Sequence, residues 1–597
     1  MKKIVIATAL FCSAASFAQQ PIVNTCTSFA ISKPLWQLAK EYPYHPSRHF
    51  EKEGEHRRLR PVVMRSVEAT DPLWFPQDTA VYDSLPILAQ WNGMNTNASP
   101  PDPSGAAGPN HYVQVVNSSY QIWNKTGTSL LGPFNLSNLW SGSHDDGDPV
   151  VLYDRFADRW VISEFDLGPS QNGPYKQLFA VSKTSDPTGQ YYLYQFSLTD
   201  FKDYPKFSIW QDGYYMGTNT DPAGLLVFER DKMLVGDNTA RNIELTAPGI
   251  TNNGFFCPMP ADADGNLPPA GTPMYFFHYE DDNWTSADVI KVIKVTTDWT
   301  NTANTTATLD ATLATASFDT DFGTTWNNIR QKGTNQRVDA LIGTFMFRAP
   351  FRVWSGYNSV LLNHTVDIDQ QNHAGIRWYE LRQTSGTWGI YQQGTYAPDT
   401  NSRWCGSMAM DDNGNIAMAY SISSRSLYPS LRYTARYATD PLGKMTFKEK
   451  TGIDGTGSIN GDNRFGDYAH MSLDPDGETF WFTGEYVSTG GTQRSRIFSF
   501  KIPKKGNVGI TASDEPVSLK VLTLHAGLWQ VVANGLTDDV KVQLDLINNL
   551  GQTVWQQTDA AHAGQLSTAV ETTGLPHGIY YLRLAVNHQQ RVAKIVW

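Results

Sequence analysis

The sequence predicts an all-β protein built around a β-propeller. Among 597 residues there are 47 glycines and 33 prolines, and 12% of the residues are aromatic. Abundant turn residues favour short strands over long helices. From about residue 105 to 503, short β-branched or aromatic runs alternate with turn residues, as in a sheet protein. So many bulky side chains can fill a large core, which excludes wholesale disorder.

The N-terminus has the layout of a secretory signal peptide. Two lysines precede an apolar run at residues 4–11, and Ser16 and Ala18 supply small residues for a cleavage site. The run is too short to span a bilayer as a helix. We expect residues 1–18 to be removed, so that the mature chain begins near Gln19; the alternative is a cytosolic N-terminal helix.

Residues 19–104 are expected to form an irregular lead-in, because their segment 50–65 is rich in charge. Three cysteines remain after the signal peptide: Cys26, Cys257 and Cys405. An odd number in an exported protein permits at most one internal disulfide and leaves one thiol over. We expect none of the three to carry chemistry.

One phrase recurs along residues 105–503: a polar entry, a short apolar strand, a tight turn and an aromatic strand. Its copies begin at Asp148, Ser407 and His470, and more weakly at His111, Lys206, Phe255 and Met346. Seven units over roughly 400 residues match the spacing of four-stranded propeller blades, whose sheets must stack around an axis. The prediction is seven blades, with six as the alternative. Two packed β-sandwiches, the other architecture, would lack such a period.

A polar linker at residues 504–516 separates the body from a small module at residues 517–597. Its apolar and polar residues alternate in four segments: 528–532, 540–547, 554–557 and 579–586. The run from Asn548 to Gln552 is a hairpin turn. This pattern predicts a small antiparallel β-sandwich.

The module resembles the type A sorting domain of type IX secretion cargo. Three motifs carry the resemblance, in order: Leu544–Val554, Leu575–Leu582 and Arg591–Val596. It implies passage through the inner membrane by the general route and through the outer membrane by the type IX machinery. The body would then be anchored at the surface or released. From the residues alone, the alternative is a carbohydrate-binding or immunoglobulin-like accessory module.

Parts of the central region resemble exported bacterial β-propeller proteins of unassigned function. The matching segments are Asn363–Asp367, Gly375–Leu381, Gly466–Tyr468 and Phe480–Tyr486. This resemblance supports the fold and implies no reaction.

Composition excludes two classes of partner. The net charge is −11, and no basic stripe is present to replace the counterions of a nucleic acid. After the signal peptide no segment has 18 consecutive apolar residues, so no membrane span is expected. The sequence also lacks the motifs of zinc proteases, serine hydrolases and phosphate-binding loops. Whether the protein is an enzyme is therefore left open.

Three turns read Asp-x-Asp/Asn-Gly: 262–265, 411–414 and 474–477. A calcium loop needs six to eight oxygens and a later glutamate, which these segments do not supply. Asp-Gly and Asn-Gly are also favoured hairpin turns, because they accept positive φ. We predict structural turns, with no metal and no cofactor; a structural calcium ion is the alternative.

Candidate ligand-binding residues follow from propeller geometry. A polar residue just before each innermost strand lies at the mouth of the central channel, where ligands commonly bind. The candidates are Asn110, Asp148, Asp339, Arg403 and Asp467, with Trp404 and Arg464 beside them. Charged groups beside an aromatic ring suit a sugar or a peptide end. The alternative is a structural ring of ion pairs, because buried Asp and Arg must be paired with or without a ligand.

The sequence thus predicts an exported propeller that binds a glycan or a surface protein. The alternative is a glycoside hydrolase or lyase with carboxylates at the channel mouth. Two accessible carboxyls about 5–5.5 or 6.5–9.5 Å apart would favour hydrolysis. A channel closed by paired Arg and Asp would favour binding elsewhere or a scaffolding role. A third alternative is a purely structural surface protein, which would have no concave polar pocket.

Overall fold

The computed structural model describes residues 20–46, 70–74, 80–95, 98–220, 224–251, 255–323, 326–504 and, with short gaps, 518–596. The chain divides into two compact units: a body that ends at Ile502, and a C-terminal unit that begins at Pro503. The predicted signal peptide at 1–18 lies outside the described residues, as does almost all of the predicted linker at 504–516.

The body is all-β, and its described strands form seven successive antiparallel groups of four, here called sheets 1 to 7. Sheet 1 holds β4 (Ser104–Ala107), β5 (His111–Val116), β6 (Ser119–Asn124) and β7 (Ser129–Asn135). Sheet 2 holds β8 (Val150–Asp154), β9 (Arg159–Asp166), β10 (Lys176–Ser182) and β11 (Tyr191–Ser197). Sheet 3 holds β12 (Lys206–Ile209), β13 (Tyr214–Gly217), β14 (Gly224–Phe228) and β15 (Arg241–Thr246). Sheet 4 holds β16 (Met259–Ala263), β17 (Met274–Glu280), β18 (Val289–Thr296) and β19 (Thr306–Ala314). Sheet 5 holds β22 (Ala349–Trp354), β23 (Tyr357–Asp367), β24 (Ala374–Thr384) and β25 (Thr387–Tyr396). Sheet 6 holds β26 (Ser402–Met410), β27 (Ile416–Ser423), β28 (Ser430–Arg436) and β29 (Lys450–Ile453). Sheet 7 holds β30 (His470–Leu473), β31 (Thr479–Ser488), β32 (Thr492–Lys501) and β3 (Ile87–Asn92).

A few short elements lie between or beside these sheets. They are α1 (Leu35–Glu41), α2 (Arg230–Val235), the 3₁₀ turns Leu136–Asn138 and Thr302–Asn304, and the two-stranded ladder of β20 (Ile329–Arg330) and β21 (Arg337–Val338).

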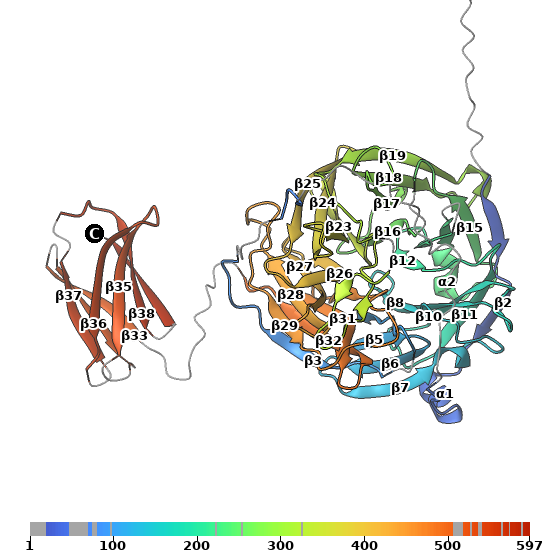
Figure 1. The fold of residues 1–597 in the computed structure, drawn as a ribbon, viewed down its shortest axis with the longest axis horizontal. Coiled ribbons are helices and arrows are strands. Elements are labelled where there is room, and N and C mark those ends of the chain that lie inside the picture. Colours follow the sequence, from blue (N-terminus) through green and yellow to red (C-terminus); the bar gives the residue numbers. More distant parts are fainter. Residues whose placement is uncertain are drawn as a thin grey trace, which may run out of the picture. The chain divides into compact units, whose positions relative to one another are not determined.

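The first strands of the seven sheets contact one another in chain order, from β4 to β8, β12, β16, β22, β26 and β30, and β30 contacts β4. Sheets 4 and 5 are joined further, because β16 and β22 pair in parallel and make one eight-stranded sheet. In Figure 1, β8, β12, β16 and β26 lie toward the middle of the body, whereas β7 and β19 lie at its periphery.

The segment predicted as an irregular lead-in, 19–104, instead contributes edge strands to three sheets. Strand β1 (Ile22–Thr25) pairs with β15, β2 (Ser28–Ile31) pairs with β11, and β3 pairs with β32. Each of them satisfies a row of backbone N–H and C=O groups that an edge strand would otherwise leave open. The final strand of the segment, β4, is the first strand of sheet 1.

That first strand differs from the one expected at His111. The first strand of sheet 1 is Ser104-Gly105-Ala106-Ala107, and His111–Val116 is the second strand. The reason is space: a Cβ on Gly105 would lie 2.3 Å from the Tyr112 hydroxyl oxygen. Small residues therefore fit where bulky, strand-favouring ones do not.

Aromatic side chains pack sheet 1 against sheet 7. The rings of Tyr112 and Trp481 are 5.2 Å apart, and those of Trp91 and Trp481 are 5.6 Å apart. The Trp481 indole N–H also donates to Asp474 Oδ2 at 2.9 Å. Burying each large apolar side chain contributes about 1.5–3 kcal/mol, so this cluster ties the first sheet to the last.

The C-terminal unit contains two antiparallel sheets around one core. The first holds β33 (Ser518–His525), β34 (Leu528–Asn534) and β37 (Gln565–Glu571); the second holds β36 (Thr553–Ala560), β35 (Lys541–Asn548), β38 (Ile579–Val586) and β39 (Gln589–Val596). The expected turn is present: Asn548 Oδ1 accepts the N–H groups of Leu550 and Gln552 at 3.0 and 2.9 Å. Such side-chain acceptance stabilises a tight turn.

Candidate functional site

A buried lysine lies where the first strands of the sheets begin. Lys206, the first residue of β12, has no exposed surface, and its Nζ lies 3.2 and 3.1 Å from the ring centroids of Tyr204 and Tyr468. Ring faces attract a cation, more strongly when water is excluded. Burial lowers the pKa of Lys206 to about 8, although the carboxylates of Asp148 and Asp467 oppose that shift.

Hydrogen bonds fix the two tyrosines. The Tyr468 hydroxyl donates to Asp148 Oδ2 at 2.8 Å, and the Tyr204 hydroxyl donates to the carbonyl of Asp467 at 3.0 Å. Asp148 precedes β8 and Asp467 precedes β30, so the cage joins three sheets. The cage therefore holds together the N-terminal ends of β8, β12 and β30.

Five of the seven predicted site residues gather around this cage. Arg464 forms an ion pair with Asp467. The carboxylates of Asp467 and Asp339 both lie near Cys405, although burial is the main cause that raises the pKa of this thiol. The ring of Trp404 packs at a tilt of 45° against that of Phe465, with ring centroids 5.5 Å apart. Together with Asp148, these predicted residues are at most 7% exposed, so they face one another rather than solvent.

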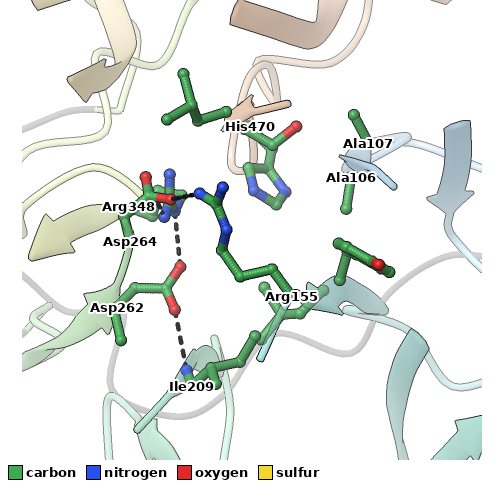
Figure 2. A pocket seen from close by; sticks show the side chains of 13 residues that line it. Ala106, Ala107, Arg155, Ile209, Asp262, Asp264, Arg348 and His470 are labelled. Atoms are coloured by element: carbon green, nitrogen blue, oxygen red, sulfur yellow. Dashed lines mark hydrogen bonds and ion pairs between the residues drawn. The ribbon is translucent and has the colours of Figure 1, made fainter. Parts of the chain in front are cut away.

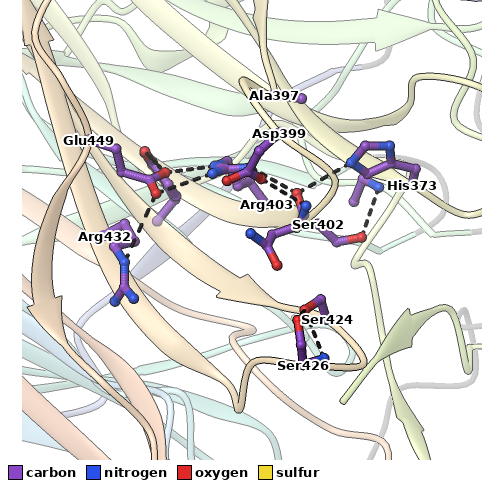
Figure 3. Close-up of polar contacts among 12 residues, drawn as sticks. His373, Ala397, Asp399, Ser402, Arg403, Ser424, Ser426, Arg432 and Glu449 are labelled. Carbon is purple, nitrogen blue, oxygen red and sulfur yellow. Dashed lines mark hydrogen bonds and ion pairs between the residues drawn. The ribbon is translucent and has the colours of Figure 1, made fainter. Parts of the chain in front are cut away.

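The remaining two lie elsewhere. Asn110 is exposed in the turn between β4 and β5. Arg403 binds two carboxylates that do not belong to the cage, Glu449 at 2.7 Å and Asp399 at 2.8 Å (Figure 3). The β26–β27 ladder changes register between Trp404 and Ser407. The prediction took the first strand to begin at Ser407, whereas β26 begins at Ser402, so Arg403 lies within the strand rather than before it.

Sequence reasoning missed Glu485, which lies in the aromatic strand β31. Its Oε1 accepts from Gln493 Nε2 at 2.7 Å, and its Oε2 accepts from the Gly466 N–H at 3.1 Å. Burial raises the pKa of Glu485 to about 8. Strand β31 reads as apolar, so only the fold reveals a buried acid there.

Glu485→Gln is expected to flatten the pH dependence of stability. The unfolded chain loses this proton near its ordinary pKa of 4.5, whereas the folded protein holds it to about pH 8. Stability contributed by this group is thus present at low pH and falls as pH rises between these values. The variant should remove a fall on the order of 3 kcal/mol between pH 5 and 8, measured by denaturant titration.

Exposed Glu41→Gln is the matched control. A hydrogen bond from Lys33 lowers the pKa of Glu41, so this acid is ionised in both the folded and the unfolded chain between pH 5 and 8, and its replacement should leave the slope in that range unchanged. An unaltered slope in Glu485→Gln would contradict the burial of an ionisable acid at this position.

The other ends of the first strands carry a second charged cluster (Figure 2). Arg348 contacts Asp262 Oδ2 at 2.7 Å through Nε and Asp264 Oδ2 at 2.9 Å through Nη2. Asp262 also accepts the N–H of Ile209 at 2.9 Å. Arg155 approaches Asp264 at 3.4 Å. The pocket among these residues has a volume of about 40 Å³, enough for water and too small for a sugar.

Charge pairing fixes the protonation states in this cluster. Burial opposes the charges of both partners, yet Asp264 and Asp262 raise the pKa of Arg348, and Arg348 and Arg155 keep that of Asp264 below its usual value. Burial lowers the pKa of His470 well below 6.5. Its neutral ring accepts the Gly105 N–H at Nδ1, at 3.3 Å. The cluster is a set of satisfied ion pairs and hydrogen bonds.

The three Asp-x-Asp/Asn-Gly segments are turns, with φ of +74° at Gly265, +77° at Gly414 and +75° at Gly477. In the second of them, Asp411 Oδ1 accepts from the N–H of Asn415 at 2.8 Å. This carboxylate therefore stabilises its own loop.

Two groups of side chains are close enough to share a cation: His144, Asp146 and Asp166, and Asp281, Asp282 and Asp288. In the first, Asp166 accepts from Lys176 at 2.9 Å and His144 at 3.0 Å. In the second, Asp281 accepts from backbone and hydroxyl donors, including the Thr320 hydroxyl at 2.7 Å. These bonds give both groups a structural role in their loops.

Comparison with known proteins identifies the C-terminal unit. Residues 503–597 match the family described as the secretion system C-terminal sorting domain. This unit is a secretion sorting domain. The sorting domain marks the protein for export through the type IX machinery to the cell surface or the extracellular space. No helix among the described residues is long and apolar enough to cross a membrane.

No curated protein matches the sequence. Solved structures similar to this chain include a protein of unknown function from Dyadobacter fermentans, with 9% identity, a TM-score of 0.32, and coverage of 70% of this chain and 99% of that one. PorZ, a surface component of the type IX secretion system of Porphyromonas gingivalis, has 9% identity, a TM-score of 0.19, and coverage of 83% and 70%. A glycoside hydrolase of family 32 from Bifidobacterium adolescentis has 11% identity, a TM-score of 0.27, and coverage of 82% and 84%. Similarity at this level assigns no activity to the body.

Proposed function

We propose that the body is a seven-bladed β-propeller that acts by binding a glycan or another surface protein. It would be exported behind a signal peptide cleaved after Ala18 and delivered by the sorting domain. The circuit of contacts from β4 through the other first strands to β30, and back to β4, supports seven blades around one axis. The pairing of β3 with β32 supports a closed ring, because an early strand completes the last sheet.

One observation favours binding over hydrolysis: at each end of the first strands, carboxylates are held by a neighbouring arginine. A glycosidase needs two accessible carboxyls, one as acid and one as nucleophile or base. Here one guanidinium, that of Arg348, holds both Asp262 and Asp264, and Arg464 holds Asp467. This pairing favours the structural reading of the predicted centre, and it directs the search for a ligand to the outer surface.

The test is a glycan-array screen of the purified exported protein, alongside an assay for newly released reducing ends. We expect binding without release of sugar. We also expect Asp467→Asn, checked for folding by circular dichroism, to retain the binding. Release of reducing ends that is lost in Asp262→Asn would overturn the proposal in favour of a hydrolase. A folded protein that binds no glycan would contradict the glycan ligand and leave a protein partner.

A further inference from the structure

A pocket of about 370 Å³ lies beside the short ladder of β20 and β21, away from the paired charges of the centre. Its lining includes Arg330 at the end of β20, Arg337 at the start of β21, and residues 331 and 333–336 of the loop between them. Arg425, from the turn between β27 and β28, completes it. Three guanidinium groups from two separate parts of the chain therefore converge on one cavity.

The ladder places two of these positive charges face to face. Arg330 and Arg337 are direct cross-strand partners, and like charges at such positions destabilise a sheet. Burial, together with the charges of Arg337 and Arg425, lowers the pKa of Arg330. The lining contains no acidic residue, although the whole protein has a net charge of −11.

The arginines of this pocket differ from the buried arginines of the body. Arg348, Arg377 and Arg403 each contact a carboxylate at 2.7 Å. Among the described residues, no carboxylate forms an ion pair with any of the three pocket arginines. Arg337 donates to neutral acceptors: the carbonyl of Asn328 at 3.4 Å and, in the orientation of the Asn372 amide that satisfies both of its polar atoms, the oxygen of that amide at 3.3 Å. Ion pairing therefore does not explain their convergence.

The loop that carries the cluster is braced. Gln331 is buried, and it both accepts from the N–H of Ile459 at 2.9 Å and donates to the carbonyl of Ile459 at 3.2 Å. The Thr334 hydroxyl donates to Asn460 Oδ1 at 2.7 Å. A braced loop loses little conformational entropy when a ligand binds, which favours affinity.

We propose that this pocket binds an acidic saccharide, one whose sugar rings carry carboxylate or sulfate groups. Planar guanidinium groups hold such oxyanions through paired hydrogen bonds. The amide of exposed Asn335, on the same lining, is placed to meet sugar hydroxyls. The cavity volume falls in the range of small-ligand sites. The proposal rests on the proposed binding function and names its ligand class.

The experiment is calorimetric titration of the full exported protein with trigalacturonate, its methyl ester and a sulfated trisaccharide. We expect the first to bind and the neutral ester to bind at least tenfold more weakly. Equal or tighter binding of the sulfated sugar identifies sulfate as the natural anion within the same class. Equal binding of the ester would overturn the proposal, as would failure of both acidic sugars to bind.

Variants locate the site. Arg330→Gln and Arg425→Gln should each weaken binding at least tenfold, whereas Arg494→Gln, on β32, should not change it. Arg330→Gln should also raise the melting temperature slightly without ligand, because it removes the cross-strand repulsion. Equal losses in all three variants would overturn the assignment. Array binding of neutral glycans that Arg425→Gln leaves intact would overturn this inference while the proposed function stands.

Discussion

Replacing Arg348 by methionine is expected to lower the free energy of unfolding of the body by about 3–5 kcal/mol, because removing one partner of a buried ion pair strands the other. Here two carboxylates would be stranded, since Arg348 contacts both Asp262 and Asp264. Methionine fills most of the volume, so the loss reports charge rather than packing. Denaturant unfolding followed by intrinsic tryptophan fluorescence measures it.

Two further variants make this test specific. Adding Asp262→Asn and Asp264→Asn to Arg348→Met should recover much of the lost stability, because neutral amides are less costly to bury unpaired. Arg159→Met, in the hairpin of sheet 2, removes an arginine that donates to backbone carbonyls of its own turn and should change stability by about 0.5 kcal/mol or less. A similar loss in Arg159→Met and Arg348→Met would refute the ion-pair explanation.

Removing residues 20–92 is expected to abolish cooperative folding of the body. The truncation takes away β3, which supplies the fourth strand of sheet 7, and Trp91, which packs on Trp481. It also opens the edges of β15 and β11, which pair with β1 and β2. Exposed edges promote aggregation. We expect loss of the monomer peak in gel filtration and a broad thermal transition.

Complementation distinguishes the strand from a general effect of truncation. A synthetic peptide of residues 80–95, added during refolding, should restore part of the monomer, since it carries β3 and Trp91. The same peptide with Trp91→Asp should not. A truncated protein that unfolds as sharply as the complete one would refute the role of β3.

The repeating phrase located most of the sheets from sequence alone. Copies at Asp148, Lys206 and His470 coincide with the beginnings of β8, β12 and β30. The phrase missed strands whose positions depend on packing and pairing with distant segments rather than on residues that favour strands. Strand β4 is built of small residues beside Tyr112, and β1 and β2 are four-residue edge strands whose partners lie more than 150 residues away. Local alternation carries no information about either.

The residues of the candidate site were predictable only where the sequence located the beginning of a first strand correctly. Asp148 and Asp467 meet through Tyr468 and Tyr204, as expected for residues that precede first strands. Arg403 lies apart because β26 begins at Ser402, five residues before the beginning expected at Ser407, which places Arg403 inside the strand. Lys206 and Glu485 were not proposed as site residues, since one opens an apolar strand and the other lies inside one. Their burial follows from tertiary packing, which a single strand does not encode.

The pairing of β3 with β32 also determines when the body can finish folding relative to its synthesis. Arg496 donates to Asn92 Oδ1 at 2.8 Å, across 404 residues of chain. At the usual pace of synthesis, roughly 5–20 residues per second, a stretch of that length takes about 20–80 s to emerge. Throughout that interval the early strand has no place to dock. Completion of sheet 7, and with it the contact between the early and late parts of the body, must therefore follow synthesis of β32.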